Sequence, residues 1–461
     1  MIARVHRPFF LAAIVTTLTA GVGWGAFLLL RIASDRSFTK LSIFEVNAHA
    51  QAQIYGWIGL FILGFAYEAF PRFRGTPLPA PRLARASLVA MLLGIVLRSV
   101  GEPLHDRPLF AALAIAGSIL QIGAVALFAF VLFRVYQYRG AAQTRHFENH
   151  DFYILSAAVW FLAGSFVDLF HVTRLVAAPT KEALLHQVAG WQFALRDLQI
   201  HGLAMMMIFG VSQRIFPIAF GSAEPSRRLL SWLWIPLDLA ILGEAVGFVR
   251  FMQTRAPLWA AVMGISILVL TAGAVAFVLT MRLWKPLPRA GRSGRFLRAS
   301  HVWLLVSMAM LATAPLYFKL SGVAFSHAWY GAMRHAITVG FLSLTVLGVS
   351  SKVIPSLAGR RPETGSRMLA PFLLVNAGCA LRVTMQVLTD FTPAAYPIAG
   401  ISGLLELTGL TIWGIELIRI LLARNEIAVT QSGAGAPLRS DPMDIHLPPT
   451  IAPPPRRRTA S

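Results

Sequence analysis

Residues 333–355 read MRHAITVGFLSLTVLGVSSKVIP, an apolar run of membrane-spanning length that begins beside an arginine and a histidine. From Gly340 onward the run has the pattern G-x7-G-x6-P. The same pattern occurs in GWIGLFILGFAYEAFP (residues 56–71) and GLAMMMIFGVSQRIFP (residues 202–217), so that successive copies start 146 and 138 residues apart. Glycines let membrane helices pack closely, and a proline suits a helix end. The three copies therefore predict three equivalent helices in a repeated architecture.

The composition is that of a polytopic membrane protein. Of the 461 residues, 56% are hydrophobic and only 13% are charged, and the mean hydropathy is +0.64. The net charge of +21 does not indicate nucleic-acid binding, because Lys and Arg cluster in short links between apolar runs, as the positive-inside rule predicts. Cys379 is the only cysteine, which excludes an intrachain disulfide and a Cys-based metal motif.

Twelve apolar runs have the length of a membrane-spanning helix. They fall near residues 8–30, 46–70, 84–103, 108–133, 152–176, 193–220, 229–251, 257–281, 300–320, 332–355, 369–389 and 394–421. One copy of the repeat occurs in every four predicted helices, namely in the second, sixth and tenth. We therefore expect an all-α membrane protein with a pseudo-threefold array of three four-helix units, whose second helices line the centre. A transporter built from two halves would instead repeat once, at about half the chain.

The distribution of Lys and Arg predicts the orientation in the membrane. The links after the second, fourth, sixth, eighth and tenth predicted helices are richer in Lys and Arg than the links on the other side, and both termini are basic. The sequence therefore predicts that both termini are cytoplasmic. Residues 1–424 form the predicted transmembrane domain, whose first helix we expect to remain uncleaved. Residues 425–461 are polar and Pro-rich, which predicts a disordered cytoplasmic tail.

Three of the twelve histidines, His49, His201 and His335, lie on the repeated helices. They precede the proline of their own repeat by 22, 16 and 20 residues, so His49 and His335 have nearly the same depth. His201 lies about 6–9 Å closer to its proline, which suits a second site. His49 and His335 could ligate one metal from opposite sides, because neutral imidazole is a common ligand of heme iron and copper. The alternative is that each imidazole is a hydrogen-bonding group between helices.

Further charged residues lie within the predicted helices, namely Arg98, Asp168, Asp238, Glu244, Arg382, Glu406 and Glu416. One interpretation is pairing between Arg and Asp or Glu on neighbouring helices. The other gives Arg98 or Arg382 the binding of a carboxylate such as a heme propionate, because a guanidinium can donate two parallel hydrogen bonds to a carboxylate. Both arginines lie toward the outer ends of their predicted helices, where the histidines also lie.

Three stretches resemble motifs of the NnrS family of bacterial heme- and copper-containing membrane proteins. RPFFLAA (residues 7–13) resembles the opening motif of that family, HAQAQIYG (residues 49–56) resembles its second-helix motif, and RHAITVGF (residues 334–341) resembles its HALTVG motif. The second motif departs from the family pattern, since Gln51 and Gln53 stand where the family commonly has a second His and a Met. The resemblance implies a heme protein linked to nitric oxide, through nitrosative stress or denitrification.

Twelve helices in three arcs also resemble, more distantly, the catalytic subunit of heme–copper oxidases. That resemblance implies that His49 and His335 hold a low-spin heme and that His201 is a copper ligand. Those oxidases have a His-His pair in helix 7 and a second His in helix 10, whereas this chain has no His in residues 229–251 and has Met333 two residues before His335. A binuclear centre that reduces oxygen or NO is therefore not expected.

The sequence thus predicts an NnrS-like protein of the bacterial inner membrane that holds b-type heme on His49 and His335. His201, alone or with His171 or His327, would hold copper or complete a second site. Two axial histidines leave iron no open position, so such a heme would transfer electrons or sense, whereas a single ligand would leave a position for NO. The expected partners are the lipid bilayer, the heme and an electron-transfer protein. The rival is a transporter or channel whose central histidines relay protons or bind a substrate.

Overall fold

The computed structural model describes residues 5–138, 146–358 and 368–423. Across these residues the chain is helical, and twelve helices are long and apolar enough to cross a membrane. The prediction of an all-α, multi-pass membrane protein is confirmed. The predicted tail of residues 425–461 lies outside the described residues.

The twelve spans follow one another in three groups of four. The first four are α1–η1–α2 (His6–Thr16, Thr17–Gly21, Val22–Asp35), α3–η2–α4 (Ile43–Gln51, Ala52–Gly59, Leu60–Phe73), α5 (Pro81–Gly101) and α6 (Pro108–Gln137). The next four are α7 (Asn149–Val176), α8–η3–α9–η4 (Lys181–Asp197, Leu198–Met205, Met206–Ile215, Phe216–Phe220), α10 (Arg227–Thr254) and α11 (Pro257–Met281). The last four are α12 (Ser293–Ser321), α13–η5–α14 (His327–His335, Ala336–Ser343, Leu344–Leu357), α15 (Leu369–Leu388) and α16 (Ala395–Leu422). The segments labelled η are π-helical.

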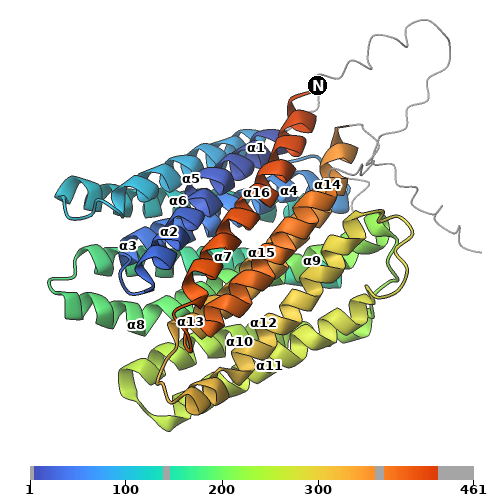
Figure 1. The fold of residues 1–461 in the computed structure, drawn as a ribbon. Coiled ribbons are helices and arrows are strands. Elements are labelled where there is room, and N and C mark those ends of the chain that lie inside the picture. Colours follow the sequence, from blue (N-terminus) through green and yellow to red (C-terminus); the bar gives the residue numbers. More distant parts are fainter. Residues whose placement is uncertain (1–4, 139–145, 359–367, 424–461) are drawn as a thin grey trace, which may run out of the picture.

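The second, sixth and tenth spans, here called the central spans, are the most buried of the bundle. In their most apolar windows 89%, 67% and 78% of the residues are buried, against 33–50% in the other spans. Figure 1 shows α3, α8 and α13 at one end of the bundle and α4, α9 and α14 toward the other. We call the first end the histidine end, because His49 and His335 lie there, and the second the proline end, because Pro71, Pro217 and Pro355 lie there.

Each central span begins at a side-chain cap that the sequence encodes. Ser42 accepts a hydrogen bond from the backbone N–H of Phe44 and forms a capping box with Glu45. Thr180 and Ser326 accept from the backbone N–H three residues later, at the starts of α8 and α13. Because such caps satisfy N–H groups that a helix leaves unpaired, they fix where each central span starts at the histidine end.

Helix packing repeats with a period of four spans. In each unit the first span packs on the central span (α1 on α4, α7 on α9, α12 on α14), and the third and fourth spans form a hairpin (α5 with α6, α10 with α11, α15 with α16). The fourth span of each unit packs on the first span of the next, in the pairs α6 with α7, α11 with α12 and α16 with α2. This closed ring is the pseudo-threefold array that the repeat predicted.

The glycines of the repeat let each central span approach the first span of its own unit. A Cβ added at the second glycine of each repeat would lie only 2.6–2.9 Å from a side-chain atom of that first span, in the pairs Gly64–Phe9, Gly210–Ile154 and Gly348–Phe296. A Cβ does not occur that close to another carbon, so the close helix contact requires glycine there.

The central spans share a second, less common feature. The π-helical segments η2, η3 and η5 each start four residues before the first glycine of the repeat (Gly56, Gly202 and Gly340) and end three residues after it. π-helical turns are rare and are frequent at functional sites. His49 lies three residues before η2, His201 lies within η3, and His335 lies directly before η5. Each of the three histidines of the repeated helices therefore lies in, or within three residues of, one of these three π-helical segments.

Candidate functional site

His49, near the end of α3, is held in one orientation by the first span. Its Nδ1–H donates to the carbonyl oxygen of Gly21 at 3.0 Å. That carbonyl can accept from a side chain because Gly21 ends η1 with a ψ of -110°, outside the helical range. The imidazole also lies against Gly25, where an added Cβ would come to 2.5 Å from His49 Cε1. Nδ1 therefore carries the proton and Nε2 keeps its lone pair, which is the tautomer of a metal-binding imidazole.

His335, the last residue of α13, has the same tautomer for the same reason. Its Nδ1–H donates to the carbonyl oxygen of Gly331 at 2.8 Å, one turn earlier. Among the described residues, the Nε2 atoms of His49 and His335 have no hydrogen-bond partner. The imidazoles of His49 and His335 are close enough to interact electrostatically, and the Arg382 guanidinium is close enough to interact with both. The fold thus brings together His49, His335 and Arg382, which are distant in the sequence.

Arg382 has a buried guanidinium that the rest of the described chain does not fully satisfy. The residue is 6% exposed, and its Nε and Nη1 atoms have no hydrogen-bond partner among the described residues, although Glu406 of α16 lies within electrostatic reach. Gln386, one turn later on the same face of α15, is also buried and has an unpaired Oε1. Buried polar atoms without partners are rare in folded proteins. A polar group bound beside His335 could satisfy them.

Arg98 of α5 differs from Arg382, because its guanidinium binds other side chains of the protein. Its Nε donates to Glu102 at 2.6 Å, its Nη1 donates to Gln121 at 3.0 Å, and it forms an ion pair with Asp168 of α7. All four side chains are at most 2% exposed. The structure therefore supports the pairing interpretation for Arg98, with two carboxylates on one guanidinium.

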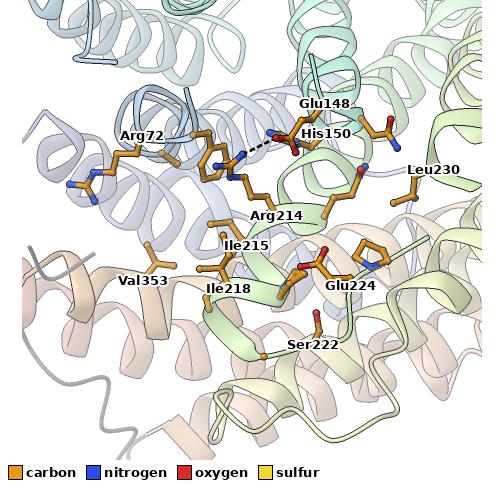
Figure 2. Close-up of a pocket in the computed structure, with 18 of the residues that line it drawn as sticks. Arg72, Glu148, His150, Arg214, Ile215, Ile218, Ser222, Glu224, Leu230 and Val353 are labelled. Carbon is orange, nitrogen blue, oxygen red and sulfur yellow. Dashed lines mark ion pairs between the residues drawn. The ribbon is translucent and has the colours of Figure 1, made fainter. Parts of the chain in front are cut away.

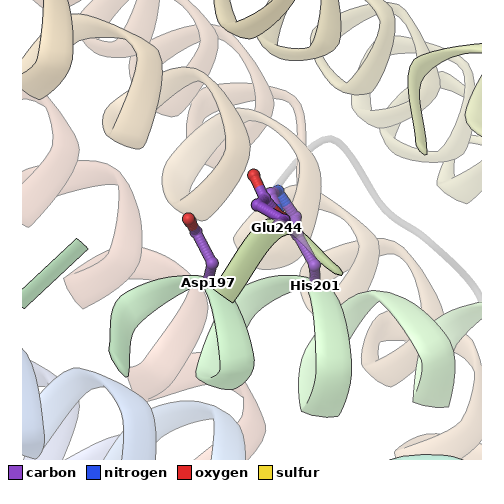
Figure 3. Close-up of side chains that lie close together, drawn as sticks. All are labelled: Asp197, His201 and Glu244. Carbon is purple, nitrogen blue, oxygen red and sulfur yellow. The ribbon is translucent and has the colours of Figure 1, made fainter. Parts of the chain in front are cut away.

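A second group of side chains surrounds His201 (Figure 3). Asp197 ends α8, His201 follows one turn later in η3, and Glu244 comes from α10. Each offers one ligand atom, and the three atoms lie within 4.8 Å of one another. The Nδ1 atom of His201 is 2.9 Å from Glu244 Oε2, and all three residues are at most 2% exposed. Arg334, the residue before His335, forms an ion pair with Asp197.

The other histidines of the predicted helices belong to separate surroundings. His171 bonds to the side chains of Gln192 at 3.3 Å and Gln187 at 3.4 Å. His327 packs against the ring of Phe325. His301 donates from Nδ1 to the Leu297 carbonyl at 2.8 Å and is enclosed by aromatic rings, those of Phe216, Phe277 and Phe341. The structure thus groups His201 with two carboxylates, and neither His171 nor His327 joins that group.

The proline end contains a cavity of about 2000 Å³ between the ends of the central spans (Figure 2). Its charged lining is mainly basic and consists of Arg72, Arg214, Arg227, Arg228, Arg289 and Lys352 together with Glu68, Glu148 and Glu224. Arg214 pairs with Glu148 at 3.7 Å. None of His49, His201 and His335 lines this cavity. The basic lining agrees with the excess of Lys and Arg in the links at this end.

Two residues of these groups were not singled out in the sequence. Asp197 precedes His201 by four residues and Gln386 follows Arg382 by four, which is the spacing of neighbours on one helix face. That spacing could have indicated both of them. The partner of Arg334 could not be read from the sequence, because Asp197 lies more than 130 residues earlier in another unit.

Comparison with known proteins agrees with this architecture. One solved structure, described as "Cryo-EM structure of a heme-copper terminal oxidase dimer provides insights into its catalytic mechanism", superposes with a TM-score of 0.59 at 13% sequence identity and covers 91% of this chain and 84% of that chain. A likeness at this identity shows a shared fold. Among curated proteins no match is found. The sequence pattern of the family described as NnrS protein matches residues 1–424, and the chain therefore belongs to the NnrS family.

Proposed function

We propose that this protein binds one b-type heme at the histidine end and uses it in electron transfer or sensing linked to nitric oxide. The observation that carries the proposal is the His49–His335 pair. Both imidazoles donate from Nδ1 to a backbone carbonyl, both keep a free Nε2, and the two come from different central spans. Imidazoles fixed in this way are the usual axial ligands of heme iron. Membership of the NnrS family supports the same assignment.

The residues around this pair fit the polar part of a heme. A heme propionate is a carboxylate, and the buried Arg382 guanidinium has two N–H groups without a partner among the described residues. A charge-assisted pair between them would satisfy both groups. Arg98 already binds two carboxylates and an amide, so we assign the propionate contact to Arg382.

When bound, heme supplies one-electron redox chemistry. The protein's own part is to hold the two Nε2 lone pairs in place, through the carbonyls of Gly21 and Gly331, and to neutralise propionate charge through Arg382. Ligation by both histidines would leave the iron no open position, which would favour electron transfer or sensing over oxygen reduction. The absence of histidine from α10 supports this further, since an oxidase-type copper site would need histidines there.

The proposal includes a location and an orientation. The chain is a multi-pass membrane protein, and we place it in the bacterial inner membrane with the proline end toward the cytoplasm. The basic cavity at the proline end supports this orientation, because cytoplasmic surfaces of membrane proteins carry the excess of Lys and Arg. The heme would then lie near the periplasmic face.

The rival function, a transporter or channel with central histidines, has less support. The large cavity opens at the proline end, and its lining contains none of the three central histidines. A path that uses them for protons or substrate would have to continue from that cavity toward His201.

The test is the heme content of the purified protein and its variants. The wild-type protein should show a Soret band and a pyridine hemochrome, and His49→Ala or His335→Ala should abolish both. His301→Ala is the control, because His301 is enclosed by phenylalanine rings and should leave the heme in place. A colourless wild-type preparation from heme-replete cells would reject the heme assignment.

A further inference from the structure

We propose that Asp197, His201 and Glu244 form a second, independent metal site for a divalent cation with oxygen and nitrogen ligands, of the Fe²⁺, Mn²⁺ or Zn²⁺ type, and not a copper(I) site. The three side chains converge from α8, η3 and α10, and one ligand atom of each lies within 4.8 Å of the other two (Figure 3). Two donors on one such ion are at most about 4.4 Å apart, since each bond is about 2.0–2.2 Å long. A small side-chain adjustment therefore suffices to place all three on one ion.

The charge balance of the group calls for a cation. Asp197 and Glu244 are 0% exposed and His201 is 2% exposed. With a neutral imidazole, two carboxylates and the single guanidinium of Arg334 leave one negative charge uncompensated in the membrane interior. Two carboxylates that share a buried site cannot both stay ionised unless a proton or a metal ion compensates them.

The arrangement of the donor atoms favours a metal ion over a proton. Glu244 Oε1 has no hydrogen-bond partner among the described residues, and Asp197 forms an ion pair with Arg334. A single proton shared by Glu244 and Asp197 would balance the charge without using the imidazole of His201. A metal ion would be held by one ligand atom of each of the three side chains.

The orientation of His201 fits the same role. Its Nδ1 contacts Glu244 Oε2 at 2.9 Å, and no described residue hydrogen-bonds to its Nε2. A separation of 2.9 Å is also that of two neighbouring ligand atoms on one ion with bonds of about 2.0–2.2 Å. His201 Nδ1 and Glu244 Oε2 would therefore bind the ion side by side, with the imidazole proton on Nε2.

The donor set does not fit the copper expected from the family resemblance. Copper(I) prefers thiolate, thioether and several imidazole ligands, whereas carboxylate oxygens suit harder divalent ions. The group contains one imidazole and two carboxylates, and the only cysteine, Cys379, lies instead against the backbone of His335. The donor set therefore favours a harder divalent ion over copper(I) at this position.

The test is the metal content of purified, detergent-solubilised protein, measured by inductively coupled plasma mass spectrometry after dialysis against EDTA and reloading with Fe²⁺, Mn²⁺ or Zn²⁺. Heme iron is measured separately as pyridine hemochrome and subtracted. The wild-type chain should retain about one non-heme divalent ion, and Glu244→Gln or His201→Gln should lose it while the heme content stays unchanged. Asp238→Asn is the matched control, because Asp238 lies on the same helix and binds only Ser156 and Trp160 among the described residues.

The outcomes separate this site from the heme. A wild-type protein with a normal hemochrome and no retained divalent ion would overturn the second site. This result is obtained on the wild-type protein and does not depend on whether the variants fold. A wild-type protein that contains no heme but retains the divalent ion would contradict the proposed function and support the second metal site.

Discussion

Trp57 of η2 donates its indole N–H to the hydroxyl oxygen of Ser343, the last residue of η5, at 3.0 Å. The bond joins the first and third central spans across the middle of the bundle, and both residues are buried, at 2% and 6% exposure. Ser343 in turn donates to the carbonyl oxygen of Thr338 within η5. A polar contact therefore fixes the relative position of the two spans that carry His49 and His335.

The first prediction concerns this bond. Ser343→Ala should lower the free energy of unfolding by about 1–3 kcal/mol, because it leaves a buried indole N–H unsatisfied. The measurement is thermal unfolding of the purified protein in detergent, followed by size-exclusion chromatography. Thr408→Ala is the control, since Thr408 is exposed and bonds only to the backbone of its own helix among the described residues. Equal stability of the two variants would show that the bond does not contribute.

Gly25 should be needed for heme binding because of its contact with His49. A methyl group at this position would come to 2.5 Å from His49 Cε1, so Gly25→Ala should displace the imidazole and reduce the heme content per chain several-fold. Gly123→Ala is the matched control, because nothing lies within 4 Å of a Cβ added there. Heme content is read from the pyridine hemochrome. If both variants retained full heme, the orientation of His49 would not matter for binding.

Arg382 should govern how tightly the heme is held. Arg382→Gln should raise the rate of heme transfer to apomyoglobin about ten- to a hundredfold, which corresponds to the roughly 1.5–3 kcal/mol of a hydrogen bond to a charged group. Arg250→Gln is the control, because Arg250 is exposed on α10 and donates to Gln253. An unchanged transfer rate in Arg382→Gln would exclude the propionate contact.

Arg98 should matter for folding and not for heme. Arg98→Met leaves Glu102 and Asp168 buried without a cation, which should destabilise the protein by about 3–5 kcal/mol. The triple variant Arg98→Met, Glu102→Gln, Asp168→Asn should recover much of that loss, because it removes the unpaired charges. Unfolding temperatures of the two variants provide the comparison. A triple variant less stable than the single one would contradict this account.

The orientation in the membrane can be tested with single cysteines, because the native Cys379 is buried. Asp106→Cys lies in the exposed link between α5 and α6 at the histidine end, and Arg228→Cys lies exposed at the start of α10 at the proline end. A membrane-impermeant maleimide should label the first variant in spheroplasts and the second only after the membrane is permeabilised. The reverse pattern would invert the assigned topology.

The sequence could predict most of the fold. Apolar runs of membrane-spanning length in this number are not compatible with a soluble protein, so the sequence indicated all twelve spans. The G-x7-G-x6-P repeat identified the central ones. The repeat carries this information because glycine is required where Gly64, Gly210 and Gly348 meet the first span of their unit. Such local steric requirements leave a visible pattern in the chain.

The candidate site could be predicted only in part. His49, His335 and His201 stood out because an imidazole in an apolar helix is conspicuous. The roles of the two arginines could not be separated, because Arg98 and Arg382 have similar apolar neighbours in sequence. Their partners come from other helices, Asp168 for the first and, within electrostatic reach, Glu406 for the second.

By itself, then, the sequence determined the class, the number of spans, the threefold repeat and the identity of the central helices, since these follow from hydrophobic length and from close packing along one helix. The tertiary structure decided which polar groups meet. It paired Arg334 with Asp197, left two N–H groups of Arg382 unpaired among the described residues, and placed Glu244 beside His201. Those encounters depend on how helices far apart in the chain are packed, and no local pattern encodes them.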